Sequence, residues 1–217
     1  MNAPVVIPRL RGLLHLHALW FAIAAAVALV VLAPDARSRV AAAIYGAGLC
    51  ALFGASALFH RWPGPARFKP LLRRIDHSAI FVFIAASYTP VSLLVLEPPM
   101  GTIVLAGAWI VAAGGVALSV AWIDAPRVLT AMAYVVAGSL IAGALPQLVT
   151  AVGVVPVALF AAGGVVYWLG AFVYASRRPD PWPQVFGFHE VFHALVIAAA
   201  LVHFVAMAGW VIPRGGA

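Results

Sequence analysis

Apolar stretches of about twenty residues follow one another along almost the whole chain, separated by short segments rich in proline and charge. A helix of this length crosses the hydrocarbon core of a bilayer, because each residue adds about 1.5 Å. Backbone groups inside the bilayer must be hydrogen-bonded within the protein, which favours helices for such stretches. The sequence therefore predicts an all-α fold, a single domain over residues 1–217 built as a seven-helix transmembrane bundle. The expected helices cover residues 14–33, 40–59, 77–96, 102–122, 128–146, 153–175 and 188–211.

Composition indicates the same class of protein. Of the 217 residues, 65% are hydrophobic and 9% are charged, which is too little charge to cover a soluble domain. The formal net charge is +7, but Lys and Arg lie in short loops rather than along one helix face. We therefore expect membrane lipids as partners and no nucleic acid, and the oligomeric state stays open. The single cysteine, Cys50, excludes an intrachain disulfide and a cysteine-based metal site.

The basic residues also predict the orientation of the bundle. Ten of the thirteen Lys and Arg residues lie in the N-terminal segment or in the second, fourth and sixth loops, and only Arg37, Arg39 and Arg214 lie on the other side. The positive-inside rule then places the N-terminus in the cytoplasm and the C-terminus outside. The first apolar stretch resembles a signal peptide, but its length and the six stretches after it favour an uncleaved helix.

Three histidines lie at helix ends that this topology brings to the cytoplasmic side. His60 ends the second helix, and His189 and His193 begin the seventh. The last two are separated by about 400° of rotation and about 6 Å of rise, so they share a face and can bind one metal ion. Asp76 is expected at the start of the third helix, at the same depth. Histidines in a lipid-embedded bundle are costly unless they have partners, so this set indicates a metal site near the inner leaflet.

Each of these residues also has a structural interpretation. The histidine pair could form hydrogen bonds within the bundle, and Asp76 could pair with Arg73 or Arg74 instead of serving the metal site. Ser56, one turn before His60, could bond to a backbone carbonyl.

The other polar residues near the expected site receive less specific interpretations. His15 either supports the site or extends toward the lipid headgroups, and His77 is interpreted as interfacial. His203 lies about 15 Å beyond His193 along the helix, too deep for a ligand. Glu190 should face a different neighbour or the interface.

Several segments together resemble haemolysin III proteins, in the superfamily of progestin and adipoQ receptors. The resemblance is carried by five segments: Pro8-Arg9-Leu10-Arg11-Gly12 with His15, Ser56-Ala57-Leu58-Phe59-His60-Arg61, Asp76-His77-Ser78-Ala79-Ile80-Phe81, Ser87-Tyr88-Thr89-Pro90 and His189-Glu190-Val191-Phe192-His193. It implies a Zn²⁺ site held by His60, His189 and His193, with Ser56 and Asp76 as the catalytic residues around a water on the metal. It also implies a multi-pass protein of the bacterial inner membrane.

Three functions follow from these observations. The first is a zinc-dependent hydrolase that acts on an amide or ester bond of a lipid, because the resemblance includes ceramidase-like receptors and alkaline ceramidases. The second is a membrane-lytic or channel-forming protein, the role that named the family. The third is a metal-stabilised receptor without turnover. The receptors of the superfamily carry a long N-terminal region, whereas about a dozen residues precede the first helix here, which makes hormone reception the weaker expectation.

Overall fold

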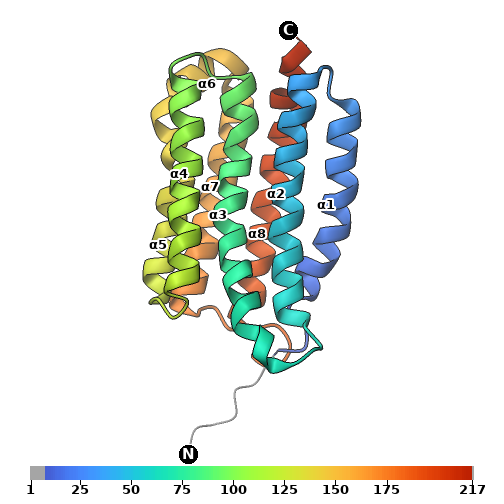
Figure 1. The fold of residues 1–217 in the computed structure, drawn as a ribbon, viewed down its shortest axis with the longest axis vertical. Helices are drawn as coiled ribbons and strands as arrows, with labels where there is room; N and C mark the ends of the chain where they lie inside the picture. The colour runs from blue at the N-terminus through green and yellow to red at the C-terminus, as the bar shows by residue number, and fades with distance from the viewer. Residues whose placement is uncertain (1–7, 217) are drawn as a thin grey trace, which may run out of the picture.

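The computed structural model describes residues 8–216, and these residues form a bundle of long helices that run side by side (Figure 1). The α-helices are α1 (Leu13–Leu32), α2 (Ala36–Arg61), α3 (Lys69–Leu94), α4 (Met100–Ala121), α5 (Arg127–Gly138), α6 (Leu145–Val152), α7 (Val154–Ser176) and α8 (Phe188–Ala206). Four short elements complete the chain: the 3₁₀ turns η1 (Ala66–Phe68), η2 (Leu140–Ala144) and η4 (Ile212–Gly216), and the π-helical turn η3 (Met207–Val211).

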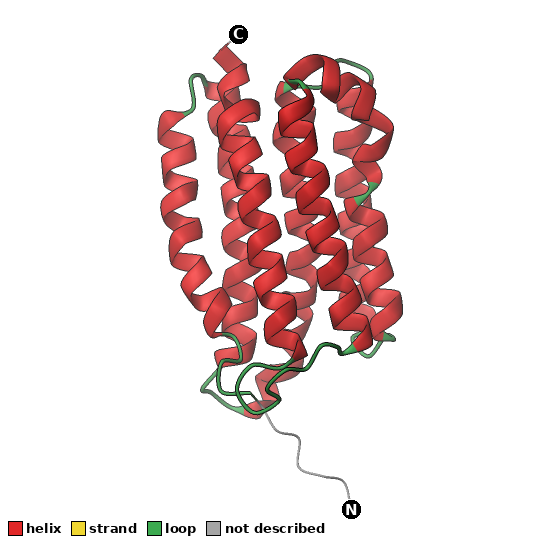
Figure 2. Ribbon diagram, turned by 180° about the vertical axis from the view of Figure 1, so that it is seen from behind, coloured by secondary structure: helices red, strands yellow, loops and turns green. Residues whose placement is uncertain are grey.

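The expected transmembrane architecture is confirmed. Within residues 8–216 there are seven helical spans long and apolar enough to cross a membrane. Four of them are single helices, whereas the third span joins η1 and α3, the fifth joins α5, η2 and α6, and the seventh continues α8 through its two terminal turns. The described part of the chain begins at one end of the bundle and finishes at the other, as the view from behind shows (Figure 2). We call these the N-terminal end and the C-terminal end of the bundle.

Short loops make most neighbours in sequence neighbours in space. Helices α1, α2, α3 and α4 pack in this order, α7 packs against α5 and α8, and α8 also contacts α1. In Figure 1, α8 lies behind α2 and α3, so the last helix returns to the interior of the bundle. This return brings the start of α8 beside the end of α2.

The third span begins earlier than the sequence analysis expected. We predicted a helix over residues 77–96 with Asp76 at its start, but α3 begins at Lys69, so Asp76 lies about two turns inside the helix. The first turns contain Pro70 at a position that helices accept, followed by apolar residues and two arginines. The charges of such an amphipathic turn lower the mean hydropathy, so a search for apolar stretches does not include it in the span.

The fifth span is interrupted near its middle, which the expected single helix over residues 128–146 did not include. After Gly138 the chain tightens into the 3₁₀ turn η2 before α6 continues the span. Tyr88 of α3 donates its hydroxyl hydrogen to the backbone carbonyl of Gly138, at 2.6 Å, with the carbonyl of Ala137 at 3.2 Å. This side chain bonds to backbone groups released by the interruption, as a buried backbone requires.

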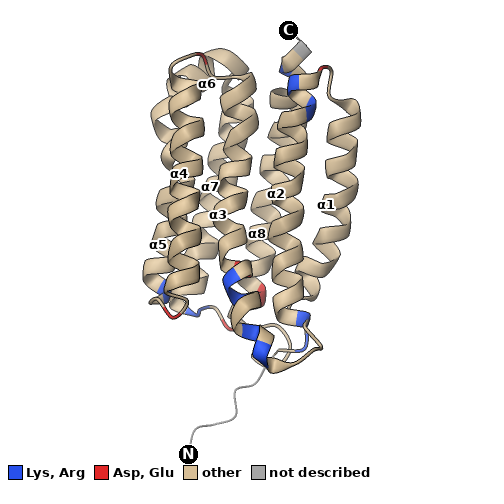
Figure 3. Cartoon of the chain, viewed as in Figure 1, with Lys and Arg blue, Asp and Glu red and all other residues tan. Residues whose placement is uncertain are grey.

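Charged side chains gather at the N-terminal end of the bundle (Figure 3). The basic residues of η1 and the first turns of α3 lie there with Arg11 and Arg127, whereas Arg37, Arg39 and Arg214 lie near the opposite end. This distribution agrees with the numbers of Lys and Arg residues that the sequence analysis assigned to the two sides of the membrane. Which end faces the cytoplasm stays a prediction.

Candidate metal centre

Three imidazole rings meet at the N-terminal end of the bundle. His60 in the last turn of α2 faces His189 and His193 in the first two turns of α8. Each ring offers one nitrogen, and the three nitrogens lie within 4.8 Å of one another. The Nε2 atoms of His60 and His189 are 3.1 Å apart. The structure thus brings together the three residues that we predicted as metal ligands.

The distance between His60 and His189 matches the requirements of a metal held by nitrogen. Zn–N bonds of about 2.0–2.1 Å at tetrahedral angles place two ligand nitrogens roughly 3.3 Å apart, close to the 3.1 Å between His60 and His189. Neutral imidazoles without a neighbouring thiolate suit zinc among the common metals. The donor set therefore fits a zinc ion, and three protein ligands leave a fourth position for another group.

His15 of α1 stacks on His193. The two ring centroids are 3.9 Å apart and the planes differ by 9°. Both nitrogens of His15 and Nδ1 of His193 are buried without a hydrogen-bond partner among the residues that the structure describes. Of the two interpretations made from the sequence, support of the site is the one that agrees with this position. A buried polar atom without a partner costs about 1–3 kcal/mol, so this end of the bundle lacks something that would satisfy it.

Glu190 holds the start of α8 in place. Its side chain is completely buried, and Oε2 accepts a hydrogen bond of 2.9 Å from the backbone N–H of Gly187, the N-cap residue. The other carboxylate oxygen forms an ion pair with Arg11 in the segment before α1. The sequence analysis placed Glu190 at a different neighbour or at the interface, and Arg11 is that neighbour. The pair fixes the helix turn that carries His189.

The segment before α1 lies against the metal centre. The backbone N–H groups of Arg9 and Leu10 donate to the carbonyls of Gln184 and Val185, at 3.0 and 3.2 Å. Gly12 then turns the chain with a φ of 77°, and a Cβ atom there would lie 2.6 Å from Cβ of His60. Only glycine adopts this conformation easily and leaves room for His60. Residues 8–12 therefore cover the N-terminal side of the centre.

Ser56 and Asp76 line a cavity that reaches His189 and His193 of the cluster. The cavity has a volume of about 480 Å³, and His15, His189 and His193 also line it. The Ser56 hydroxyl lies next to the Asp76 carboxylate. Asp76 is not one of the three clustered ligand residues, so its position suits a group that acts beside the metal. Its role, like that of Ser56, stays a prediction.

Arg73 and Arg74 bond to groups other than Asp76, with which the sequence analysis considered that they could pair. Arg73 donates to Asp124 at 2.9 Å, and Arg74 donates to the backbone carbonyls of Val120 and Pro70. Both arginines are thus bonded to the end of α4, the loop after it or their own helix, and Asp76 lines the cavity.

The two remaining histidines have different surroundings. His77 lines the cavity and its carbonyl accepts the hydroxyl of Tyr134, at 3.4 Å, so it is less interfacial than expected. His203 lies deeper, away from the three-histidine cluster, and bonds to the carbonyl of Phe160 at 3.0 Å. Its depth agrees with the prediction that it is not a ligand.

Sequence comparison identifies the family once this geometry is known. The model of the family described as "Haemolysin-III related" matches residues 5–204, which include every residue of the centre. The chain belongs to the haemolysin-III-related family. It is a multi-pass membrane protein of that type, as the seven spans also indicate.

Relatives of this haemolysin III protein occur in bacteria and animals. It is 29% identical to Hemolysin-3 of Bacillus cereus over 82% of this chain and 78% of that protein. It is 30% identical to the human Monocyte to macrophage differentiation factor, over 81% of this chain and 72% of that protein. A shorter stretch of 46 residues, 19% of this chain and 10% of the relative, is 50% identical to the Adiponectin receptor protein of Drosophila melanogaster. No solved structure matches the chain.

Sequence reasoning missed the contribution of the segment before α1. The ion pair between Arg11 and Glu190 spans nearly the whole chain, and the contact of Gly12 with His60 depends on helix packing. The only sequence signal was that Arg11 and Gly12 belong to one of the segments that carry the family resemblance. Spacing along the chain does not show such a contact, because it compares residues within one helix.

Proposed function

We propose that this chain is a zinc-dependent membrane hydrolase that cleaves an amide or ester bond of a lipid. The convergence of His60, His189 and His193 on one point carries the proposal. Zinc held by these residues would polarise a substrate carbonyl and make a neighbouring water more acidic. The buried ring nitrogens of His15 and Nδ1 of His193 also support it, because residues 8–216 leave these polar groups without hydrogen-bond partners.

Asp76 is placed to handle the proton of the reaction. It faces the cavity beside the cluster, and its neighbour Ser56 can donate a hydrogen bond that orients the carboxylate. A carboxylate in this position accepts the proton of the attacking water and returns it to the leaving group, as a general acid–base does. Ser56 in this proposal is a positioning residue.

The cavity suits a lipid. Its lining is largely apolar and extends from Asp76 and His189 at one end to Leu148 and Met207 at the other. On α8 alone, the distance from His189 to Met207 corresponds to about 27 Å, and the volume lies in the range of small-molecule pockets. Trp168 of α7 lines the cavity and is 53% exposed, so the cavity is not closed at this residue. In this proposal a lipid enters from the bilayer past Trp168.

We place the centre at the cytoplasmic side of a bacterial inner membrane. Ten of the thirteen Lys and Arg residues of the sequence belong to the N-terminal end of the bundle, and such excess marks the cytoplasmic side. The N-terminus would then be cytoplasmic and the C-terminus outside. The relatives named Hemolysin-3 in Bacillus species support the bacterial setting.

The test is the zinc content of the purified protein. We expect about one zinc ion per chain in the unaltered protein and nearly none in His193→Ala, because two imidazoles hold zinc far more weakly than three. His17→Ala is the matched control, since His17 is exposed on the same helix as His15 and should leave the zinc content unchanged. A protein that takes up no zinc from zinc-supplemented buffer contradicts the proposal, as does a His193→Ala variant with full zinc content.

A membrane-lytic function is the second candidate, favoured by the name of the relative Hemolysin-3. Liposomes filled with a fluorescent dye separate the two functions. Leakage caused by the protein both before and after zinc is removed with a chelator supports lysis or channel formation. Release of a fatty acid from a lipid amide or ester that stops when zinc is removed supports the hydrolase.

A further inference from the structure

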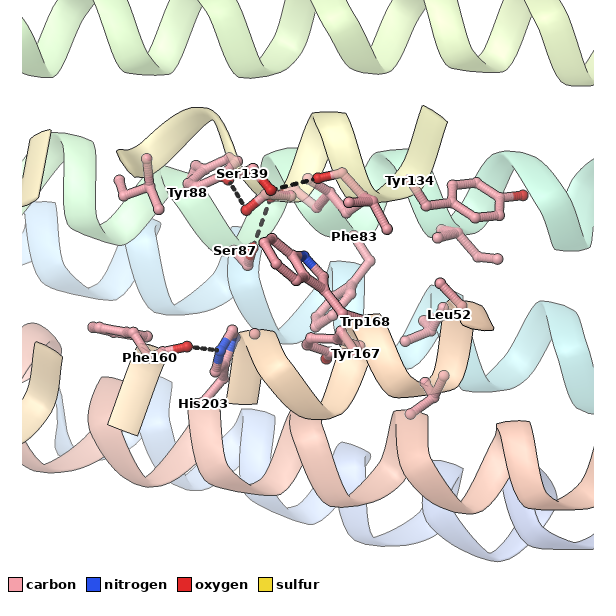
Figure 4. Close-up of a pocket in the computed structure, with 18 of the residues that line it drawn as sticks. Leu52, Phe83, Ser87, Tyr88, Tyr134, Ser139, Phe160, Tyr167, Trp168 and His203 are labelled. Carbon is pink, nitrogen blue, oxygen red and sulfur yellow. Dashed lines mark hydrogen bonds between the residues drawn. The ribbon is translucent and has the colours of Figure 1, made fainter. Parts of the chain in front are cut away.

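A second group of polar side chains lies in the cavity, far from the three histidines. His203 of α8 and Tyr167 of α7 both line the cavity, and their rings are 5.4 Å apart (Figure 4). His203 lies ten residues after His193, or about 15 Å along the helix axis. Gly163 of α7 makes room for the His203 ring, because a side chain at Gly163 would overlap it. The two residues thus occupy a defined position deep in the membrane-spanning part of the bundle.

The hydroxyl of Tyr167 differs from the other cavity hydroxyls at this depth. Ser87, Tyr88 and Ser139 each donate to a backbone carbonyl, at distances of 2.6–2.7 Å for the shortest bonds. The Tyr167 hydroxyl is buried and has no hydrogen-bond partner within residues 8–216. Leaving it so costs about 1–3 kcal/mol, and in a membrane no bulk water compensates. A bound group is the simplest source of the missing partner.

His203 adds a defined acceptor to this position. Its Nε2 contacts the carbonyl oxygen of Phe160 at 3.0 Å, and a carbonyl only accepts, so Nε2 carries the hydrogen. The neutral ring then has its lone pair on Nδ1, which accepts a hydrogen bond. A hydroxyl group both donates and accepts, so it can satisfy His203 and Tyr167 together. A carboxylate or a ketone only accepts and satisfies Tyr167 alone.

We propose that Tyr167 and His203 form a second binding site within the cavity, which takes a hydroxyl group on the chain of a lipid. This inference rests on the proposed function in one respect, that the reacting carbonyl of the lipid lies at the three histidines. An extended alkyl chain covers about 15 Å with about twelve carbons. The site therefore selects lipids whose chain is hydroxylated near the twelfth carbon.

Binding of three fatty acids tests the site directly. Displacement of a fluorescent fatty acid from the full chain in detergent micelles measures the affinities of octadecanoate, 12-hydroxyoctadecanoate and 2-hydroxyoctadecanoate. We expect 12-hydroxyoctadecanoate to bind about three- to ten-fold more tightly than octadecanoate, the effect of one or two hydrogen bonds. 2-Hydroxyoctadecanoate should gain no such advantage, because its hydroxyl lies at the wrong distance.

Two variants assign the effect to the site. Tyr167→Phe removes only the unpartnered oxygen, so the protein should stay folded and lose the preference for the 12-hydroxyl group. Tyr45→Phe is the matched control, because its hydroxyl is equally buried and without a partner in the described part of the chain but does not line the cavity. It should keep the preference. If Tyr167→Phe does not fold, His203→Gln retains a donor toward Phe160 but replaces the Nδ1 acceptor by an amide oxygen in a different position, and should also lose the preference.

The outcomes distinguish this inference from the proposed hydrolase. Equal affinities for octadecanoate and 12-hydroxyoctadecanoate, or a preference unchanged in both Tyr167→Phe and His203→Gln, overturn the second site even if the protein binds zinc and hydrolyses lipids. A preference that depends on Tyr167 in a protein without zinc or hydrolysis supports the site and overturns the hydrolase.

Discussion

His60, His189 and His193 are each fixed from a different direction. His60 is held at the end of α2 with Gly12 against it, and His189 follows the N-cap of α8 that Glu190 completes. His193 has the parallel ring of His15 on one side. Rings held in this way cannot turn toward other partners without disturbing the packing. For the proposed metal ion, such fixed rings would reduce the loss of conformational entropy on binding.

Asp76 provides the sharpest test at the residue scale. In Asp76→Asn we expect lipid hydrolysis to fall by about 10²–10⁴-fold, because an amide cannot accept the proton of the attacking water. Zinc content should stay near that of the unaltered protein, since Asp76 is outside the three-histidine cluster. The measurements are release of fatty acid from a lipid amide and the zinc content of the same preparation. Full activity in Asp76→Asn would remove this residue from the mechanism.

At the scale of elements, the segment before α1 acts together with the start of α8. Two backbone hydrogen bonds join Arg9 and Leu10 to the loop before α8, and the ion pair of Arg11 with the buried Glu190 adds a third connection. The N-terminal segment is therefore part of the centre, although it lies outside the seven spans.

The ion pair predicts a large and coupled change in stability. Arg11→Ala leaves the completely buried carboxylate of Glu190 without its partner, which should lower the free energy of unfolding by about 3–5 kcal/mol. The double variant Arg11→Ala with Glu190→Gln should recover part of this loss, because no buried charge remains. Thermal unfolding in detergent measures Arg11→Ala, Glu190→Gln and the double variant. Additive effects of the two substitutions would show that the residues do not interact.

The interruption of the fifth span predicts that the Tyr88 hydroxyl contributes to stability. Tyr88→Phe removes the hydroxyl that bonds to the carbonyl of Gly138, so the free energy of unfolding should fall by about 1–3 kcal/mol. Thr150→Val is the control, because its hydroxyl bonds to carbonyls of α6 on the exposed surface. Unfolding by heat or by a denaturing detergent measures both variants. Equal stability of Tyr88→Phe and the unaltered protein would mean that the interruption of the fifth span does not require this bond.

At the scale of the whole molecule, the return of α8 to the interior creates the cavity. Helices α1–α4 pack in sequence order, and the pair α7 and α8 closes the bundle on the side that α5 covers loosely. The metal centre lies at one end of the resulting space, and the Tyr167 site lies further along it. In the proposed function, this arrangement would measure a lipid along its length, with the reacting group at the N-terminal end of the bundle.

The orientation in the membrane can be measured independently. We expect alkaline phosphatase fused to the C-terminus to be active, because this enzyme folds outside the inner membrane, and a fluorescent protein fused to the N-terminus to be fluorescent in the cytoplasm. The physical reason is the excess of Lys and Arg at the N-terminal end of the bundle. The reverse pattern of the two fusions would place the metal centre on the outer side.

Much of this protein follows from the chain alone. Apolar length determines the seven spans, because unpaired backbone groups are excluded from a bilayer, and short loops determine that successive helices run antiparallel. Four-residue spacing places His189 and His193 on one face, and antiparallel packing places His60 at their depth. These deductions use distances within one helix or the direction of a helix, which the sequence contains.

Tertiary packing decided the rest. The stacking of His15 on His193, the pairing of Arg11 with Glu190 and the position of Tyr167 beside His203 all depend on the rotation of one helix relative to another. The position of Asp76 in the cavity wall, rather than at a helix terminus, likewise appears only in the folded bundle. Hydrophobicity around most of each helix suits lipid and protein neighbours alike, so the sequence does not specify these rotations, and only close packing in the folded bundle selects them.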